Sequence, residues 1–226
     1  MTTPIVALDV STMEDVRRIT GELQGLITFY KVGLQLFTAV GAKAVEHLRD
    51  RLRAEVFLDL KLLDIPQTVT HAVREAGEMG VSSVSIHLWG GAAMVKMACE
   101  LPKRPKVWGV SVLTSLTSED LKILGGRTPE ALVPELAQLG MANGMDGLVC
   151  SGQELPLIQA LPKRPVTVIP GVRSSQDPVG DQKRVVTPLE AARAGADYIV
   201  VGRPITQAKD MRGAAERIVA EIRAAR

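Results

Sequence analysis

Residues Val56–His87 read VFLDLKLLDIPQTVTHAVREAGEMGVSSVSIH. A short apolar run over Val56–Lys61 is followed by a helical pattern over Pro66–Met79 and by a second apolar run over Val84–His87. Apolar runs of this length predict strands, and a proline at the start of the middle segment suits the first turn of a helix. The stretch therefore predicts two parallel strands joined by a helix.

The same alternation recurs along all 226 residues. Strands are predicted at Ile5–Asp9, Thr28–Val32, Val56–Lys61, Val84–His87, Val107–Val112, Gly147–Cys150, Val166–Ile169 and Tyr198–Val201. Helical patterns between them include Met13–Leu26, Val40–Arg53, Pro66–Met79, Pro129–Asn143, Pro188–Ala194 and Gly213–Ala225. Eight such units in a chain of this length predict an α/β fold, a (β/α)8 TIM barrel forming a single domain over residues 1–226. An open doubly wound sheet is the alternative, and the lack of GxGxxG after the first strand weakens it.

Composition excludes several classes of function. The chain has 27 Lys and Arg against 25 Asp and Glu, and its seven aromatic residues (2 Trp, 2 Tyr and 3 Phe) leave few platforms for stacked bases, which argues against a nucleic-acid partner. Cys99 and Cys150 lie far apart without a CxxC spacing, which disfavours a disulfide framework and a zinc site. No apolar run approaches the roughly eighteen residues of a membrane helix, and no secretory signal opens the chain. These features predict a cytoplasmic protein with no membrane partner.

One short motif occurs twice. The sequence LPKRP stands at residues 101–105 and again at 161–165, and each copy leads into a predicted strand. Because nothing else in the flanking sequence repeats, we interpret the motif as a helix-to-strand connector used twice.

Charged residues end the first three predicted strands. Asp9 ends the first, Lys31 ends the second, and Asp59 and Lys61 end the third. Side chains alternate along a strand, so Asp59 and Lys61 share one face, and neighbouring barrel strands bring all four charges to one wall of the mouth. Asp64 adds a fifth charge nearby.

Three interpretations of this cluster are open. A salt-bridge network would close the barrel top, but gathering ions out of water costs several kcal/mol per ion unless their pairing is nearly ideal. Asp9, Asp59 and Asp64 would offer oxygen ligands to Mg²⁺, although the two interleaved lysines would repel the cation. Proton-transfer chemistry is the third interpretation, and we favour it because such clusters perturb pKa values in the way that proton transfer requires.

A candidate phosphate site follows the last two predicted strands. The seventh leads into Pro170-Gly171-Val172-Arg173 and the polar loop Ser174–Arg184, and the eighth leads into Gly202-Arg203-Pro204. In barrels of this class the loops after strands seven and eight often bind phosphate, and arginine offers a charged fork to its oxygens. The polar loop has the composition of a lid over an anion.

The segment Asp59-Leu60-Lys61-Leu62-Leu63-Asp64-Ile65-Pro66-Gln67-Thr68 resembles the DxKxxDIPxT signature of the orotidine 5'-monophosphate decarboxylase family. Related sugar-phosphate decarboxylases share DxK and the second Asp but usually lack the IPxT continuation. Further likeness to the family extends through residues 7–9, 31–33, 113–115, 170–173 and 201–203.

This resemblance implies a cofactor-independent decarboxylation of orotidine 5'-monophosphate to uridine 5'-monophosphate, the last step of de novo pyrimidine biosynthesis, with no metal. It implies that Lys61 protonates C6 of the pyrimidine, that Asp59 lies beside the substrate carboxylate, and that Asp9 and Lys31 bind the ribose hydroxyls. It also implies a homodimer with shared active sites, in which Asp64 and Ile65 enter the site of the partner subunit. The remaining implied contacts are Thr68, Thr114 near the pyrimidine (with Thr117 as its alternative), and Arg173, Gln182, Gly202 and Arg203 at the 5'-phosphate.

Two other functions stay open on the sequence. A magnesium-dependent sugar-phosphate decarboxylase of the same superfamily would need an added acidic ligand at a neighbouring strand end, where the fourth strand instead ends in His87. We interpret His87 as a packed or hydrogen-bonded histidine, because no second catalytic partner accompanies it. A non-catalytic nucleotide-binding barrel is the third candidate, and the presence of both Asp59 and Lys61 argues against it.

Overall fold

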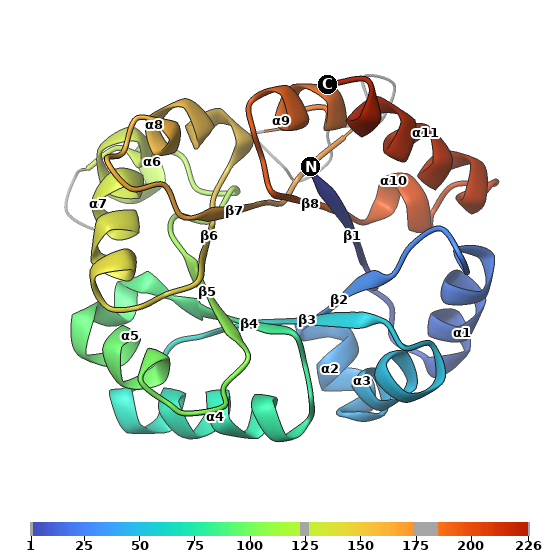
Figure 1. Ribbon diagram of the computed structural model, residues 1–226, viewed down its shortest axis with the longest axis horizontal. Helices are drawn as coiled ribbons and strands as arrows, with labels where there is room; N and C mark the ends of the chain where they lie inside the picture. The colour runs from blue at the N-terminus through green and yellow to red at the C-terminus, as the bar shows by residue number, and fades with distance from the viewer. Residues whose placement is uncertain (1, 123–126, 174–184, 226) are drawn as a thin grey trace.

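Eight parallel strands close into a barrel in chain order, so the predicted (β/α)8 fold is confirmed (Figure 1). The computed structural model describes residues 2–122, 127–173 and 185–225. Closure is made by the pairing of β1 with β8, in which Thr3 lies opposite Tyr198. The strands are β1 (Thr3–Ala7), β2 (Phe29–Gly33), β3 (Glu55–Leu62), β4 (Ser83–His87), β5 (Lys106–Val110), β6 (Gly147–Val149), β7 (Val166–Ile169) and β8 (Tyr198–Val201).

The helices form a ring outside the strands, as expected when each parallel strand is followed by a helix that returns the chain (Figure 1). In the first half of the chain they are α1 (Met13–Glu22), α2 (Leu34–Val40), α3 (Lys43–Glu46), η1 (His47–Arg51), α4 (Pro66–Glu78), η2 (Leu88–Gly90) and α5 (Gly91–Cys99). In the second half they are α6 (Ser118–Lys122), α7 (Pro129–Ala142), η3 (Gly152–Glu154), α8 (Leu155–Gln159), α9 (Pro188–Arg193), α10 (Arg203–Thr206) and α11 (Met211–Arg223).

Several predicted bounds differ from the structure by one to four residues, and two differences bear on the arrangement of the elements or of the site. The helix predicted over Val40–Arg53 does not exist as one element, because Gly41 adopts a φ of 64° and turns the chain between α2 and α3. Strand β1 ends at Ala7, so Asp9 follows the strand instead of ending it. The residues after β1 still lie beside β2, since the Leu8 amide donates to the Lys31 carbonyl at 3.0 Å.

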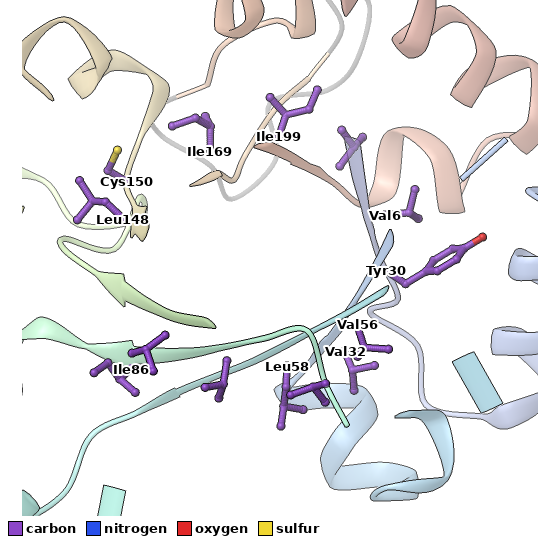
Figure 2. Packing of buried hydrophobic residues seen from close by; sticks show 14 of the residues in the cluster. Val6, Tyr30, Val32, Val56, Leu58, Ile86, Leu148, Cys150, Ile169 and Ile199 are labelled. Carbon is purple, nitrogen blue, oxygen red and sulfur yellow. The ribbon is translucent and has the colours of Figure 1, made fainter. Parts of the chain in front are cut away.

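Apolar side chains form two layers of core on opposite faces of the strands. The outer layer fills the space between strands and helices, where Figure 2 shows Val6, Val32 and Leu58 directed away from the barrel axis. A smaller inner cluster fills the barrel and includes Phe29, Phe57, Trp108, Val110, Val149, Val168 and Val200. The rings of Phe57 and Trp108 pack with their centroids 4.5 Å apart. These side chains fill the barrel interior, so a ligand can bind only outside it, at the ends of the strands.

The repeated LPKRP motif makes two equivalent clamps, which confirms that it connects a helix to a strand in both copies. Arg104, just before β5, pairs with Asp146, just before β6, and the Asp146 carboxylate also accepts from the Val107 amide at 2.7 Å. Arg164, before β7, pairs in the same way with Asp197, before β8. The Asp197 carboxylate accepts from the amide of Thr167, the second residue of β7, at 2.8 Å. The motif therefore ties neighbouring strands together at their amino ends.

Candidate active site

A cavity of ≈ 520 Å³ opens at the carboxyl ends of the strands. This is the size of a typical small-molecule site, and it lies where barrels of this architecture carry their chemistry. Most of the residues predicted to bind or act on a ligand line it, namely Asp9, Lys31, Asp59, Lys61, Thr114, Arg173, Gly202 and Arg203. The carboxyl ends of β1, β2, β3, β5, β7 and β8 thus converge on one space.

Carboxylates and ammonium groups alternate along one wall of this cavity. The Lys31 ammonium lies 2.9 Å from Oδ1 of Asp9 and 3.7 Å from Oδ2 of Asp59. The Lys61 ammonium donates to both oxygens of Asp59, at 2.9 and 2.8 Å. The order Asp9, Lys31, Asp59, Lys61 is the cluster predicted from the strand ends. Leu58 and Leu60 pack in the outer core, as the alternation along β3 predicts.

Asp59 is the most buried member of the chain of charges, with 8% of the residue exposed. Burial alone raises the pKa of its carboxyl group, but the charges of Lys61 and Lys31 and the hydrogen bonds from Lys61 and Ser85 outweigh burial and hold the pKa below its usual value of 3.8. Asp59 is therefore a carboxylate at neutral pH, although it lies almost out of contact with water.

Lys61 occupies an unusual backbone conformation. Its φ is 49°, in the left-handed region that non-glycine residues rarely adopt and that costs of order 1 kcal/mol or more. The pairing of β3 with β4 is irregular at the same place, between Leu58 and Leu62. Bulges of this kind redirect side chains beside active sites, and here the irregular segment contains both Asp59 and Lys61.

The predicted phosphate site lies at the same cavity, where β7 and β8 end. Gly171 turns the chain after β7 with a φ of 73°, which a side chain would strain, and Arg173 follows with only 8% of the residue exposed. The Arg173 amide donates to the Val186 carbonyl at 3.0 Å, and this hydrogen bond holds the backbone of the arginine in place. Arg203 begins α10 directly after Gly202. Gln182 and the rest of the predicted lid, residues 174–184, lie outside the described residues.

Asp64, Ile65 and Thr68 do not line the cavity of their own chain. All three are exposed, and 66% of Ile65 is accessible. Oδ1 of Asp64 accepts from the Ile65 amide at 2.6 Å, directly before α4 begins at Pro66. The second half of the DxKxxDIPxT segment therefore faces outward while its first half faces the cavity.

The structure separates the two candidate threonines. Thr114 lines the cavity, whereas Thr117 accepts from the Asp120 amide at 3.3 Å at the start of α6. Sequence reasoning missed the cavity residues Gln35 and Gln207, and it missed Ser85, which contacts Asp59. The period-two pattern of β4 places Ser85 on the inward face, but only the paired strand shows what it contacts.

His87 is enclosed at the end of β4. Its burial, with a smaller contribution from the Lys61 charge, lowers the pKa of His87 from 6.5 to about 4. The ring lies against Trp89, with centroids 6.4 Å apart, and does not line the cavity. This environment agrees with our interpretation of a packed, neutral histidine.

Two features are absent from the part of the chain that the structure describes. Across residues 2–122, 127–173 and 185–225, no group of three or more His, Cys, Asp and Glu side chains is placed to hold a metal ion. None of the helices in the same ranges is both long enough and apolar enough to cross a membrane.

The fold and the cavity together define a class: a (β/α)8 barrel whose mouth carries an alternating carboxylate and ammonium chain and two arginines. The model of the Orotidine 5'-phosphate decarboxylase / HUMPS family matches residues 2–218. The chain belongs to this family.

Individual relatives agree with this assignment. The chain is 43% identical to the orotidine 5'-phosphate decarboxylase of Trichlorobacter lovleyi, over 96% of this chain and 94% of that protein. It is 45% identical to the enzyme of the same name from Pseudomonas putida, over 97% of this chain and 96% of that protein. The crystal structure of orotidine 5'-phosphate decarboxylase from Lactobacillus acidophilus matches with a TM-score of 0.84 and 31% identity, over 98% of this chain and 99% of that one.

Proposed function

We propose that this protein is a carbon–carbon lyase that decarboxylates orotidine 5'-monophosphate to uridine 5'-monophosphate in pyrimidine biosynthesis. The observation that carries the proposal is the Asp59–Lys61 ion pair in the wall of a cavity that Arg173 and Arg203 also line. The names of the relatives support the same reaction. A biosynthetic enzyme of this kind would work in the cytoplasm.

Substrate binding would begin at the phosphate. Arg173 and Arg203, with the Gly202 amide at the start of α10, supply donors that suit phosphate oxygens. Asp9 and Lys31 would bind the ribose hydroxyls, and Thr114 would lie near the pyrimidine. Binding energy from the phosphate is then available at the reacting end, since contacts with distant parts of a substrate can drive desolvation and orientation.

The chemistry would take place between Asp59 and Lys61. The bond between C6 and the carboxyl carbon breaks, carbon dioxide leaves, and the electron pair stays on C6 as a carbanion. The Lys61 ammonium stabilises this charge and then gives C6 its proton. Asp59 holds the ammonium in place through both of its oxygens and lies where it would oppose the substrate carboxylate.

We propose that a second copy of the chain completes the site. Asp64, Ile65 and Thr68 belong to the family signature but face outward, where they would reach the cavity of a partner. Large apolar side chains are exposed in the segments that follow the neighbouring strands β2 and β3, with Leu34 58% and Leu63 54% accessible. Exposed large apolar residues of this kind are typical of subunit interfaces. The homodimer would thus carry two shared sites.

The cavity offers less support for a magnesium-dependent sugar-phosphate decarboxylase. The Lys31 ammonium already lies between the carboxylates of Asp9 and Asp59, 2.9 and 3.7 Å from their oxygens. A divalent cation would have to displace this ammonium or accept its repulsion. The charge that neutralises the two aspartates is therefore supplied by the chain itself.

The proposed reaction can be tested directly. Chelator-treated protein is mixed with orotidine 5'-monophosphate, and the ultraviolet absorbance is followed as uridine 5'-monophosphate forms. We expect fast turnover that added Mg²⁺ does not change. Turnover that requires Mg²⁺ would support the sugar-phosphate relative's chemistry. Tight binding of uridine 5'-monophosphate without turnover would identify a nucleotide-binding barrel and would contradict the role of Lys61.

A further inference from the structure

Ser85 lies in the middle of β4 and is completely buried. Its hydroxyl group contacts both functional residues of β3. Oγ accepts a hydrogen bond from the Lys61 amide at 2.8 Å, and it donates to Oδ1 of Asp59 at 2.8 Å. A single side chain on the neighbouring strand therefore joins the backbone of one member of the ion pair to the carboxylate of the other.

The direction of these two hydrogen bonds follows from the groups involved. An amide nitrogen can only donate, and an ionised carboxylate can only accept. The single hydroxyl hydrogen of Ser85 must therefore point to Asp59, while an oxygen lone pair faces the Lys61 amide. Hydrogen bonds to a charged group are stronger than neutral ones, so this orientation is well determined.

The strand register explains why the contact matters for Lys61. Leu58 lies opposite Val84 and Leu62 lies opposite Ile86, so three residues of β3 face Ser85 alone. The extra length is absorbed at Lys61, whose φ is 49°. In a regular parallel ladder a strand amide donates to a backbone carbonyl of the neighbouring strand, whereas the Lys61 amide donates to a side-chain hydroxyl. The Ser85 hydroxyl supplies a replacement acceptor for the amide of a residue in a strained conformation.

We propose that Ser85 is a positioning residue for the decarboxylation. It holds the Lys61 backbone in the left-handed conformation and fixes the Asp59 carboxylate, so that the ammonium stands where the carbanion forms. Ser85 does not line the cavity and so would act only through these two residues. The proposed effect of Ser85 on catalysis rests on the proposed function, whereas its hydrogen bonds with Lys61 and Asp59 can be tested without substrate.

The chain offers a matched control on the same strand. Ser83 lies two residues earlier, on the same face of β4, and is also completely buried. Its Oγ makes no hydrogen bond to any described residue. Ser83→Ala and Ser85→Ala therefore remove the same atom from equally buried positions, and only the second change removes the contacts with Lys61 and Asp59.

Kinetics and product binding are measured for both variants. We expect Ser85→Ala to lower kcat by roughly tenfold to a hundredfold, the range that follows from a lost hydrogen bond to a charged group and a displaced catalytic atom. The Kd for uridine 5'-monophosphate should change by less than about threefold, because the phosphate contacts remain. Ser83→Ala should match the wild type in both quantities. If Ser85→Ala does not fold, Ser85→Cys leaves no void, because the thiol is slightly larger than the hydroxyl, but it bonds weakly and should show the same loss of kcat.

A second readout does not depend on turnover. Hydrogen exchange of the Lys61 amide is followed by NMR in ¹⁵N-labelled wild-type, Ser83→Ala and Ser85→Ala protein. Loss of its acceptor should speed exchange of this amide by about tenfold or more in Ser85→Ala only. Unchanged exchange, a kcat within about threefold of the wild type, or an equal loss in Ser83→Ala would overturn the inference. If wild-type protein does not decarboxylate the substrate, the proposed function fails and the exchange experiment still decides the role of Ser85.

Discussion

Gly33 leaves the space in which Asp9 and Lys31 meet. A Cβ atom at this position would stand 2.6 Å from the Lys31 ammonium nitrogen and 3.2 Å from Oδ1 of Asp9. The backbone of Gly33 is extended, with a φ of −98°, so the demand for glycine comes from close approach and not from the dihedral angle. Because Gly33 has no Cβ atom, the Lys31 ammonium of β2 can reach the Asp9 carboxylate that follows β1.

We predict that Gly33→Ala impairs activity much more than stability, because the methyl group displaces the end of a flexible lysine and not the backbone. Turnover of orotidine 5'-monophosphate should fall by at least about tenfold, while the melting temperature stays close to that of the wild type. Gly21→Ala is the control. Nothing lies within 4 Å of the added atom in α1, and the change should leave activity intact and stabilise the helix by up to about 1 kcal/mol. Equal activity in both variants would contradict this explanation.

His87 makes stability depend on pH. Because burial and the Lys61 charge lower its pKa from 6.5 to about 4, the unfolded chain binds a proton in this range while the folded chain does not. The free energy of unfolding should therefore fall as the pH is lowered from 6.5 towards 4. Burial, with Arg17 and Arg51, also lowers the pKa of His47, which adds to the same trend.

Urea unfolding of wild type and His87→Asn at pH 7, 6 and 5 isolates this contribution. His47 is present in both proteins, so the difference in slope reports on His87 alone. We expect the variant to lose less stability on acidification than the wild type. Parallel curves would show that His87 titrates normally in the folded state.

At the scale of single residues, the sequence predicts a functional side chain when a charged residue occupies an inward position of a predicted strand. Asp59 and Lys61 stand two positions apart in an apolar run, so their shared face could be inferred and a role in proton transfer could be proposed for them. Ser85 could not be found in this way. A serine on an inward strand position is ordinary, and its importance depends on three residues of the neighbouring strand facing it.

At the scale of elements, the two clamps at the amino ends of the strands should support stability and not catalysis. Asp146 holds both Arg104 and the Val107 amide, far from the cavity. Removing its carboxylate leaves a partly buried amide and an arginine without this acceptor. Because the catalytic face of a barrel is the opposite one, damage here should not reach the ion pair of Asp59 and Lys61.

We predict that Asp146→Ala lowers the free energy of unfolding by about 1 to 3 kcal/mol and leaves kcat unchanged. Urea unfolding and the decarboxylation assay measure the two effects. Glu135→Ala removes an exposed ion pair with Arg127 and should change neither quantity, since such pairs contribute little. If Asp146→Ala lost kcat under conditions in which it is fully folded, the clamp would also affect the geometry of the active site.

Among the helices, a proline start signal separates exact starting positions from the wrong prediction over Val40–Arg53. The helices beginning at Pro66, Pro129 and Pro188 start where predicted, because proline marks the first turn. The continuous pattern over Val40–Arg53 gave no such signal, and the positive φ of Gly41 divides it. The apolar periodicity is shared by both pieces because both pack on the same outer core.

At the scale of the whole molecule, barrel closure joins the two ends of the chain. Four residue pairs connect β1 to β8, so the first and last strands depend on each other. We predict that the chain unfolds as a single domain, with one transition seen alike by tryptophan fluorescence and far-ultraviolet circular dichroism. Transitions at different urea concentrations would indicate separate units.

The proposed homodimer would combine residues of two chains in each active site. Lys61 lies in the cavity of its own chain, whereas Asp64 faces outward and is proposed to serve the partner. If so, Lys61→Ala and Asp64→Ala disable different halves of a shared site. Each homodimer should lose nearly all turnover, while Lys61→Ala should still bind uridine 5'-monophosphate because its phosphate contacts are intact.

The heterodimer of these two variants, purified through a different tag on each chain, shows whether Lys61 and Asp64 of different chains form one active site. One of its sites combines an intact Lys61 with an intact Asp64, and the other site lacks both. We predict about half of the wild-type turnover per dimer, as one of two equivalent sites is restored. A heterodimer as inactive as its parents would contradict the shared site, and wild-type turnover in the Lys61→Ala homodimer would contradict the mechanism itself.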